Sequence, residues 1–199
     1  ILRHKGYAGV KWIGTFGAPL PGYPFSHGNL VILSSIRTGS PAAIAGATRI
    51  TAMRTAGGHG AVQAKYLANP DPAVLTVLGC GAQARAGVFG FLTQFPSLRQ
   101  VRVFSRSRGP MERLRRDLDG RAETVLCASP EEALQGSNLV LAASGAQSPL
   151  LTWNMLRPGV TVVGIEGFRD LDPEIGKRAA KWYLGYPPRH PCIDRLPPR

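Results

Sequence analysis

Two glycines close an apolar run near the middle of the chain. Residues 73–78 are mostly apolar, and Gly79, Gly81 and Ala84 follow them at the spacing G-x-G-x-x-A. In that arrangement the first glycine permits a tight turn, the second lets a pyrophosphate approach the backbone, and the small third residue keeps a helix close to the strand. The phosphates would lie over free N–H groups at the start of a helix near Ala82. The spacing predicts a dinucleotide site, and a purely structural glycine-rich turn is the alternative.

A cluster of hydroxyl and guanidinium groups ends the next apolar strand, at residues 100–105. In dinucleotide-binding proteins this strand normally presents an acidic residue to the adenosine ribose of NAD. Here it ends in Ser105, Arg106, Ser107 and Arg108. Guanidinium groups bind a 2′-phosphate bidentately, whereas a carboxylate would repel it. The cluster favours NADP over NAD as the cofactor, unless these arginines are ordinary surface charges.

Three charged side chains are candidates for substrate binding or catalysis. Glu166 follows a presumed core strand, where a carboxylate beside a nicotinamide could act as general acid or base. Lys11 in an apolar strand and Arg54 near a helix start are both suited to hold a substrate carboxylate. Each of the three could equally be a solvated surface charge. His27 and His59 have no partner at a metal-ligand spacing, so we predict no metal site.

A parallel sheet is the element that would bring these residues together. Strand-like runs alternate with helical patterns over residues 73–186, with strands expected at 73–78, 100–105, 123–127, 139–142 and 159–164. Helices are expected at about 82–94, 110–118, 130–135 and 172–180, with a last strand at 181–184. Such alternation is typical of an α/β fold with a doubly wound, Rossmann-type parallel sheet. Ligands collect at the carboxyl ends of such strands. One crevice there should be lined by residues 79–83, 105–108, 143–145 and 164–166.

The segment before that sheet has a different pattern. Strand-like runs occupy residues 9–14 and 29–34, and a short apolar segment follows at 42–45. A helical period begins at Ile50, and the glycines at 57, 58 and 60 indicate that something packs very close to that helix. Asn69-Pro-Asp-Pro72 ends it and marks a domain boundary. We predict three parts: a smaller domain over residues 1–72, the Rossmann-type domain over 73–186 and an irregular tail over 187–199.

The composition describes a globular protein with a basic surface. Of the 199 residues 44% are hydrophobic and 18% charged, which excludes a disordered chain. The net charge of +12 comes mostly from scattered arginines without interleaved aromatic residues, so nucleic acid is not an expected partner. The absence of a long apolar run and of a signal pattern predicts a cytoplasmic protein without a membrane partner. The cysteines Cys80, Cys127 and Cys192 have no metal-like spacing, and their odd number argues against a disulfide framework.

Six short segments occur in one order along the chain: Gly9-Val-Lys11, Gly22-Tyr-Pro24, Ile50-Thr-Ala-Met-Arg-Thr-Ala56, Ala64-Lys-Tyr-Leu-Ala68, Gly79-Cys-Gly-Ala-Gln83 and Leu171-Asp-Pro-Glu-Ile175. In this order they resemble the ornithine cyclodeaminase/mu-crystallin family. The specific pairing is T-A-x-R-T-A followed further along by G-x-G-A-Q. The resemblance runs from about Gly9 to Ala180 and so covers most of the chain.

This resemblance implies a fold and an activity. It implies a Rossmann domain joined to a substrate-binding and dimerisation domain, of which residues 1–72 would be a part, and hence a homodimer. It implies an NAD(P)-dependent oxidoreductase acting on an amino acid or its imine, as a ketimine reductase or an amino-acid dehydrogenase. The alternatives are an ammonia lyase of the ornithine cyclodeaminase type, which recycles NAD internally, and an inactive nucleotide-binding protein.

The resemblance also assigns residues. Lys11 and Arg54 would grip the substrate carboxylate, and Lys11 and Glu166 are the catalytic candidates. The residues along the cofactor would be Arg54, Thr55, Ala82, Gln83, Ser144 and Gly164, in addition to Gly79, Gly81 and the cluster that begins at Ser105. The glycines at 57, 58 and 60 then have a reason, because their helix would approach the bound cofactor.

Departures from the family pattern limit the activity expected. Glu166 stands where cyclodeaminases carry a catalytic aspartate, Ser105 stands where they carry an acidic residue, and residues 25–27 replace a loop that usually contains threonine. These differences disfavour ornithine cyclodeamination and leave hydride transfer to or from an imino acid. Family members extend further at both ends, so we expect the chain to lack another carboxylate-binding arginine and much of the dimer platform.

Overall fold

The computed structural model describes residues 5–15, 27–68, 71–165 and 169–183. Its contacts divide the chain into two compact units, Ile1–Arg54 and Thr55–Arg199, which are described separately below. This contact boundary lies inside a helical run, whereas the domain boundary predicted at residue 72 lies after that run. The functions assigned to the predicted domains stay predictions.

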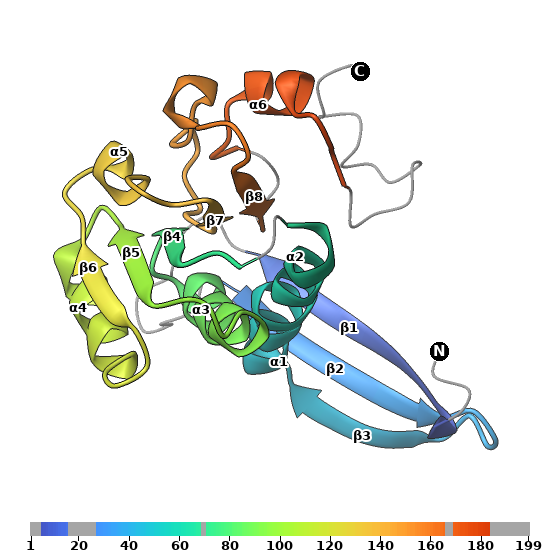
Figure 1. The fold of residues 1–199 in the computed structure, drawn as a ribbon. Coiled ribbons are helices and arrows are strands. Elements are labelled where there is room, and N and C mark those ends of the chain that lie inside the picture. The colour runs from blue at the N-terminus through green and yellow to red at the C-terminus, as the bar shows by residue number, and fades with distance from the viewer. Residues whose placement is uncertain (1–4, 16–26, 69–70, 166–168, 184–199) are drawn as a thin grey trace. The chain divides into compact units, whose positions relative to one another are not determined.

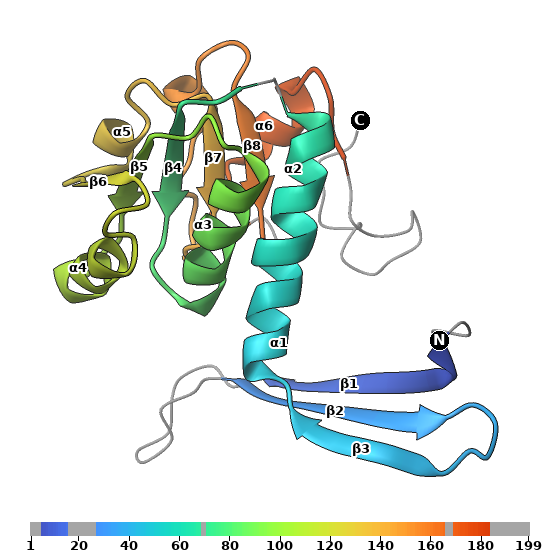
Figure 2. The ribbon, with the colours of Figure 1, turned by 60° about the horizontal axis from the view of Figure 1, so that its bottom comes forward.

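The first unit is built on a three-stranded antiparallel sheet in the order β1–β2–β3 (Figure 2). Its strands are β1 (Tyr7–Thr15), β2 (His27–Ser35) and β3 (Pro41–Gly46), so both predicted strands are present and the short apolar segment is a third. The register pairs Lys11 with Val31. Within the described residues of this unit the buried apolar side chains are Ala47 and Ala52, whereas Trp12 is 71% exposed.

A helical run follows this sheet. It consists of α1 (Thr48–Ala52), the π-helical segment η2 (Met53–Gly60) and α2 (Ala61–Leu67). The run ends close to the predicted stop, where Asp71 adopts a left-handed conformation with φ at +54°. The sequence predicts a helix here but not its π-helical middle, because a pattern of alanine and glycine does not separate i→i+4 from i→i+5 hydrogen bonds.

The second unit contains a five-stranded sheet in the order β6–β5–β4–β7–β8 (Figure 1). Its strands are β4 (Val74–Leu78), β5 (Gln100–Phe104), β6 (Glu123–Leu126), β7 (Leu139–Ala142) and β8 (Thr161–Gly164). Every pairing is parallel. The chain runs outward from β4 to β6 and returns on the other side of β4 as β7. The switch in strand order falls between β4 and β7, which confirms the doubly wound, Rossmann-type α/β fold.

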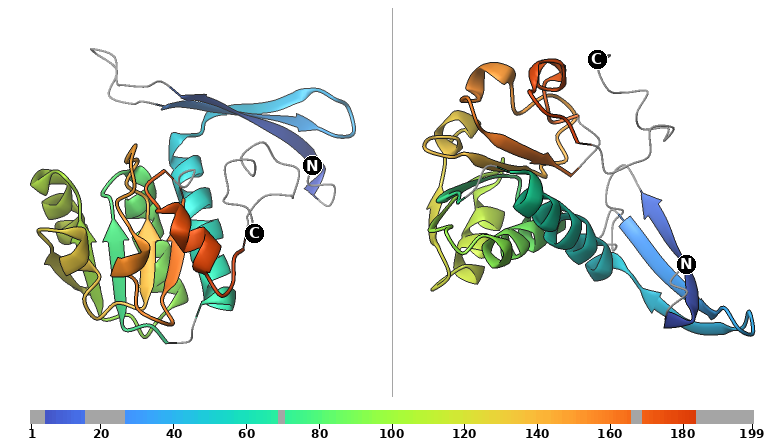
Figure 3. Two further views of the ribbon diagram at one scale, coloured as in Figure 1. Left: turned by 90° about the horizontal axis from the view of Figure 1, so that it is seen from above. Right: turned by 45° about the vertical axis from the view of Figure 1, so that its right-hand side comes forward.

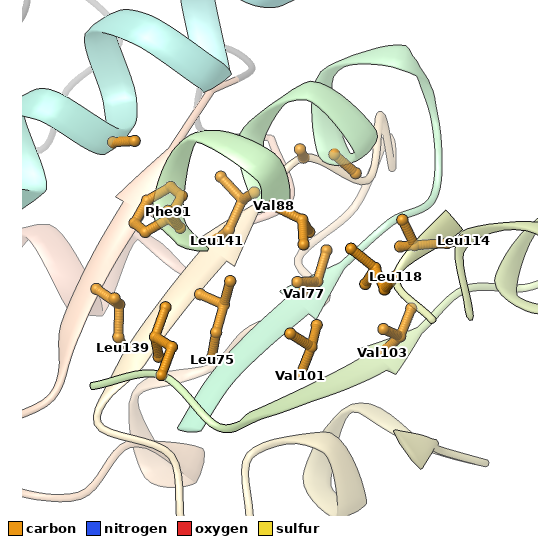
Figure 4. Packing of buried hydrophobic residues seen from close by; sticks show 14 of the residues in the cluster. Leu75, Val77, Val88, Phe91, Val101, Val103, Leu114, Leu118, Leu139 and Leu141 are labelled. Atoms are coloured by element: carbon orange, nitrogen blue, oxygen red, sulfur yellow. The ribbon is translucent and has the colours of Figure 1, made fainter. Parts of the chain in front are cut away.

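Helices cover both faces of this parallel sheet (Figure 3). They are α3 (Ala82–Gln94), α4 (Arg108–Asp117), α5 (Pro130–Ala133), the 3-10 turn η3 (Trp153–Met155) and α6 (Pro173–Arg178). On one face, strand residues such as Val77 pack with Phe91 of α3 and Leu114 of α4 (Figure 4). A separate apolar cluster contains Ala133 of α5 and Ile175 of α6. Burying a large apolar side chain contributes about 1.5–3 kcal/mol, so these two clusters hold the strands in place.

One predicted element is wrong. A strand was expected at residues 181–184, but residues 181–183 form no strand and residue 184 lies outside the described residues. Trp182 packs against the apolar cluster of α5 and α6 instead. A short apolar run gives the same sequence pattern whether it pairs with a strand or packs sideways on a core. The predicted irregular tail at 187–199 also lies outside the described residues.

In the described part of the chain, no helix has the length and apolar character needed to span a membrane.

Candidate functional site

Gly79 sits in a turn that excludes any side chain. It follows β4 with φ at +112°, and its N–H donates to the carbonyl of Phe104 at 2.8 Å. A Cβ atom there would lie 2.2 Å from the carbonyl oxygen of Ala143 and 2.8 Å from Cα of Ser144. The positive φ and this close approach both require glycine. The tight turn that the sequence predicts at this position is therefore present.

Gly81 leaves open space at the start of α3. It is the N-cap residue of that helix, and the first turn contains no acidic residue. No side chain in the described part of the chain caps this turn. A Cβ atom on Gly81 would meet no atom of the described residues within 4 Å. The amide of Arg85 is bonded to the carbonyl of Gly81 at 3.0 Å, and the N–H groups before it have no partner inside the helix. Such N–H groups attract anions, so these residues fit the diphosphate of a dinucleotide.

Four predicted cofactor positions lie at one edge of the parallel sheet. Gly79, Ser105 and Ser144 follow β4, β5 and β7 closely, and Gly164 is the last residue of β8. Because these strands are parallel, their carboxyl ends share one edge, beside the switch between β4 and β7. Glu166, the predicted catalytic carboxylate, lies outside the described residues. The contacts of these residues with a cofactor stay predictions.

Two of the four side chains in the cluster after β5 are exposed and form no ion pair or cap bond among the described residues. Ser105 is hydrogen-bonded to the thiol of Cys80, which ties it to the glycine-rich turn. Arg108 is paired with Glu112 at 3.3 Å. Arg106 and Ser107 are exposed, and neither an ion pair of Arg106 nor a cap bond of Ser107 occurs among the described residues. These two side chains are therefore open to an anionic ligand, and their contact with a 2′-phosphate stays a prediction.

Cys80, between the two glycines, is an inert thiol. Burial raises its pKa to about 11, although the hydrogen bond from Ser105 and the positive charges of Arg113 and Arg85 act in the opposite direction. The thiol is protonated at neutral pH and is not a nucleophile. Arg85 is paired with Asp117 at 2.6 Å, whereas Arg113 of α4 is a nearby cation that the sequence reading missed. It was missed because it lies in a helix and not at a strand end.

Ser144, after β7, is bound to a buried carboxylate that the sequence reading also missed. Oδ2 of Asp170 accepts hydrogen bonds from Oγ of Ser144 at 2.8 Å and from its backbone N at 3.3 Å. Asp170 is only 2% exposed. Asp170 lies just outside the segment Leu171–Ile175 by which the family is identified. No motif or spacing in the sequence therefore distinguishes it. Its burial becomes visible only in the folded chain.

Within the first unit, Lys11 and Arg54 line the same hollow. This hollow has a volume of about 470 Å³ and includes Tyr7 and Val31 of the antiparallel sheet. Nζ of Lys11 donates to Oγ1 of Thr51 at 3.4 Å. Neither Lys11 nor Arg54 forms an ion pair with any described residue. Two cations without carboxylate partners beside one hollow are suited to bind an anionic group, such as a carboxylate.

The glycine at position 57 packs against protein. A Cβ atom on Gly57 would lie 2.8 Å from the carbonyl oxygen of Ala86 in α3, and a Cβ atom on Gly90 would lie 2.1 Å from the carbonyl oxygen of Gly57. The close neighbour expected for this helix is therefore α3, which accounts for Gly57 without a cofactor. The side chain of Gln83 strengthens the same contact, because its Oε1 accepts a hydrogen bond from the backbone N of Ala56 at 3.3 Å.

One further predicted cofactor position, Thr55, has no resolved role. Thr55 is partly buried in η2, and its contact with a cofactor stays a prediction. His59 lies in the same segment, and the described residues contain no group of three or more side chains that could hold a metal ion.

The sheet order and the glycine-rich turn define a Rossmann-type α/β protein. The chain belongs to the ornithine cyclodeaminase/mu-crystallin family, whose model matches residues 2–190. It is 33% identical over 158 residues to ketimine reductase mu-crystallin of Rattus norvegicus, covering 77% of this chain and 49% of that protein. It is 29% identical over 179 residues to alanine dehydrogenase of Archaeoglobus fulgidus, covering 87% and 54% respectively. The chain thus spans about half the length of the curated relatives it matches.

Solved structures show the same fold. Delta(1)-pyrroline-2-carboxylate reductase of Thermococcus litoralis, in complex with NADH and L-proline, is similar with a TM-score of 0.71 and 26% identity, over 83% of this chain and 53% of that chain. A probable ornithine cyclodeaminase from Bordetella pertussis has a TM-score of 0.75 and 25% identity, over 90% and 56%. A reductase and a probable cyclodeaminase therefore share the fold of this chain.

Proposed function

We propose that the protein is an NAD(P)-dependent oxidoreductase that interconverts an amino acid and its imine, with NADP(H) as the preferred cofactor. The observation that carries this proposal is the Gly79-x-Gly81-x-x-Ala84 turn at the switch point of the parallel sheet. The similarity to a ketimine reductase and to an alanine dehydrogenase supports the reaction class.

The cofactor would be held along the carboxyl edge of the sheet. The open backbone at Gly81 and the first turn of α3 would bind the diphosphate. Arg106 and Ser107 would bind the 2′-phosphate of NADP, and Ser144 and Gly164 would lie on the nicotinamide side. Hydride transfer between nicotinamide C4 and the substrate Cα is the chemistry that a bound cofactor would supply.

Two cations would hold the substrate. Lys11 and Arg54 line one hollow without carboxylate partners among the described residues, so they would bind the carboxylate of the amino or imino acid. Fixing that carboxylate limits the orientations of the neighbouring Cα, which favours hydride transfer. Glu166, a water that it orients, or Lys11 would exchange the proton of the imine nitrogen.

The full-length gene product should be tested for cofactor binding before turnover. Calorimetry with NADPH and NADH should detect binding, with NADPH the tighter ligand. The absorbance of NADPH should then fall when pyruvate with an amine, or a cyclic imine, is added. Binding of neither cofactor would overturn the proposal.

The same experiment separates the two alternatives. Release of ammonia from ornithine without a net change in cofactor absorbance would indicate a lyase that recycles its cofactor. Tight cofactor binding with no turnover of any amino or imino acid would indicate a nucleotide-binding protein without activity. A homodimer, which the family resemblance implies, and a cytoplasmic location, which the sequence pattern predicts, belong to the same proposal. Light scattering tests the oligomeric state.

A further inference from the structure

We propose that Asp170 is a positioning residue for the nicotinamide half of the cofactor. Its buried carboxylate would fix the turn at Ser144, and that turn would then orient the ligand. This inference rests on the proposed function. It concerns a residue that neither the glycine-rich turn nor the strand-end cluster includes.

The Asp170 carboxylate is buried, and one of its two oxygens has no hydrogen-bond partner among the described residues. The residue is 2% exposed, and its Oδ1 is a buried atom without a hydrogen-bond partner among the described residues. Burying a carboxylate with half of its acceptors unused is costly, because the charge loses its hydration without full compensation. From the described residues, its other oxygen, Oδ2, accepts two hydrogen bonds, both from Ser144.

The fold itself needs the backbone of this residue more than its side chain. The carbonyl oxygen of Asp170 accepts hydrogen bonds from the amides of Leu150 and Leu151 at 2.8 and 3.0 Å. The neighbouring Leu171 forms a bridge with Leu151. Any residue type would supply those backbone bonds. The carboxylate is therefore best explained by what it does to Ser144.

The carboxylate sets the polarity of the Ser144 hydroxyl. Oγ of Ser144 donates its single hydrogen to Asp170 at 2.8 Å and accepts a hydrogen bond from the amide of Ala146 at 3.1 Å. A hydroxyl has one donor and two acceptor positions, so one lone pair remains. A ligand at this oxygen must donate a hydrogen bond. The carboxamide NH₂ of nicotinamide is such a donor, whereas a phosphate or carboxylate is not.

The backbone at Ser144 also packs against the glycine-rich turn at Gly79. A side chain on Gly79 would collide with the carbonyl of Ala143 and with Cα of Ser144, so the backbone after β7 lies directly against the glycine-rich turn. In a doubly wound sheet the adenosine half lies over the first strands, and the other half of the dinucleotide crosses the switch point. Ser144, at the end of β7, is on the far side of that switch. Asp170 thus fixes a donor-selective group on the nicotinamide side.

Binding measurements on the full chain test this inference. NADPH probes the whole cofactor, and adenosine 2′,5′-bisphosphate probes the adenosine half alone. We expect Asp170→Asn and Ser144→Ala each to raise the Kd of NADPH about 5- to 30-fold, the size expected for one lost hydrogen bond to a charged or polar partner. The Kd of the bisphosphate should stay unchanged. The Kd of NADPH for the double variant should not exceed the larger of the two single-variant Kd values. Both substitutions break the same Asp170–Ser144 interaction, so their effects should not add.

Asp172→Asn is the matched control. It neutralises a carboxylate two residues away that accepts hydrogen bonds from the amides of Glu174 at 3.0 Å and Trp153 at 3.4 Å. We expect this variant to bind NADPH like the wild type.

Three outcomes would overturn the inference. One is an unchanged NADPH affinity in Ser144→Ala, which decides the matter even if Asp170→Asn does not fold. Another is an equal loss of affinity for both probes, which would indicate a general folding role. The third is full additivity in the double variant. If the wild-type protein binds no dinucleotide, the proposed function is contradicted instead. If the wild-type protein prefers NADH, the same variants are compared with NADH as the whole cofactor and AMP as the adenosine half.

Discussion

Substitution of Arg106 tests the proposed preference for NADPH over NADH. It is exposed, lies next to the end of β5 and has no ion-pair partner among the described residues. A hydrogen bond to a charged group contributes about 1.5–3 kcal/mol, so Arg106→Ala should weaken NADPH binding about 10- to 100-fold. The affinity for NADH should stay the same, because NADH has no 2′-phosphate. Calorimetric titration of both cofactors measures the difference.

Arg116→Ala is the control for the Arg106 variant. Arg116 lies in the last turn of α4, so its substitution removes the same charge at the other end of the helix that follows Arg106. A general effect of net charge would lower NADPH affinity in both variants. An unchanged NADPH affinity in Arg106→Ala would contradict the assignment of a 2′-phosphate to this cluster.

Cys80 should resist alkylation at neutral pH. Burial raises its pKa from an ordinary value near 9 to about 11, so at pH 8 only about one thiol in a thousand is ionised. The rate of labelling by iodoacetamide, followed at the Cys80 peptide by mass spectrometry, should keep rising with pH up to about 11. In urea the rate should level off near pH 9. Levelling near pH 9 in the folded protein would contradict the burial of this thiol.

The same pKa shift makes stability depend on pH. Because the folded state holds the proton more tightly than the unfolded state, the contribution of Cys80 is fully present below about pH 9. It is lost as the pH rises from about 9 to 11, where the unfolded thiol ionises first. The free energy of unfolding of Cys80→Ser should therefore fall less over this pH range than that of the wild type.

At the scale of elements, the contact between η2 and α3 depends on two glycines. A Cβ atom on Gly90 would lie 2.1 Å from the carbonyl oxygen of Gly57 and 2.7 Å from its Cα, so one of the two helical segments must move. Overpacking of this kind costs about 1–3 kcal/mol, which exceeds the gain of up to about 1 kcal/mol from replacing a helical glycine by alanine. Gly90→Ala should therefore lower the free energy of unfolding measured with urea.

Gly109→Ala provides the comparison for Gly90→Ala. Gly109 is also a helical glycine, but among the described residues a Cβ atom there would meet only the end of the Arg113 side chain, at 3.7 Å. Its substitution should leave stability unchanged or raise it slightly. Destabilisation of similar size in both variants would show that the close approach at Gly57 does not matter.

The elements of the second unit could be predicted because their signals are local. The apolar run before Gly79 and the spacing to Ala84 specify a strand, a turn and a helix within a few residues. The neighbour of Gly57 and the carboxylate on Ser144 could not be predicted in the same way. Each depends on residues far apart in the sequence, and glycine or aspartate at such positions reads equally well as a loop or surface residue.

The shared position of Lys11 and Arg54 could be predicted only in part. Their residue types suit Lys11 and Arg54 to a carboxylate, but only the family resemblance predicts that both bind the same one. A lysine in a strand and an arginine in a helix have no characteristic sequence spacing that would show this. The structure places both side chains beside the same hollow. It does so because the helical run begins directly after β3 and α1 contacts β2.

At the scale of the whole chain, buried apolar residues are unevenly distributed. In the second unit, β4 and β7 lie within the two apolar clusters, and Leu75, Val77 and Leu141 have no exposed surface. In the first unit, Trp12 and Ile44 are 71% and 67% exposed. Because hydrophobic burial is the dominant favourable term in folding, the two units should differ in local stability.

Hydrogen exchange of the backbone amides measures this difference. At low protein concentration, amides of β4, β5 and β7 should exchange only by global unfolding, and those of β1, β2 and β3 about 100-fold faster or more, a gap of about 2.8 kcal/mol. The exchange rates of β8 should lie between those of the two groups, since among the described strands it pairs only with β7. Equal protection of the two sheets in dilute solution would contradict this expectation. Protection of β1–β3 that rises with protein concentration would instead mean that a second copy covers the antiparallel sheet, as the proposed homodimer requires.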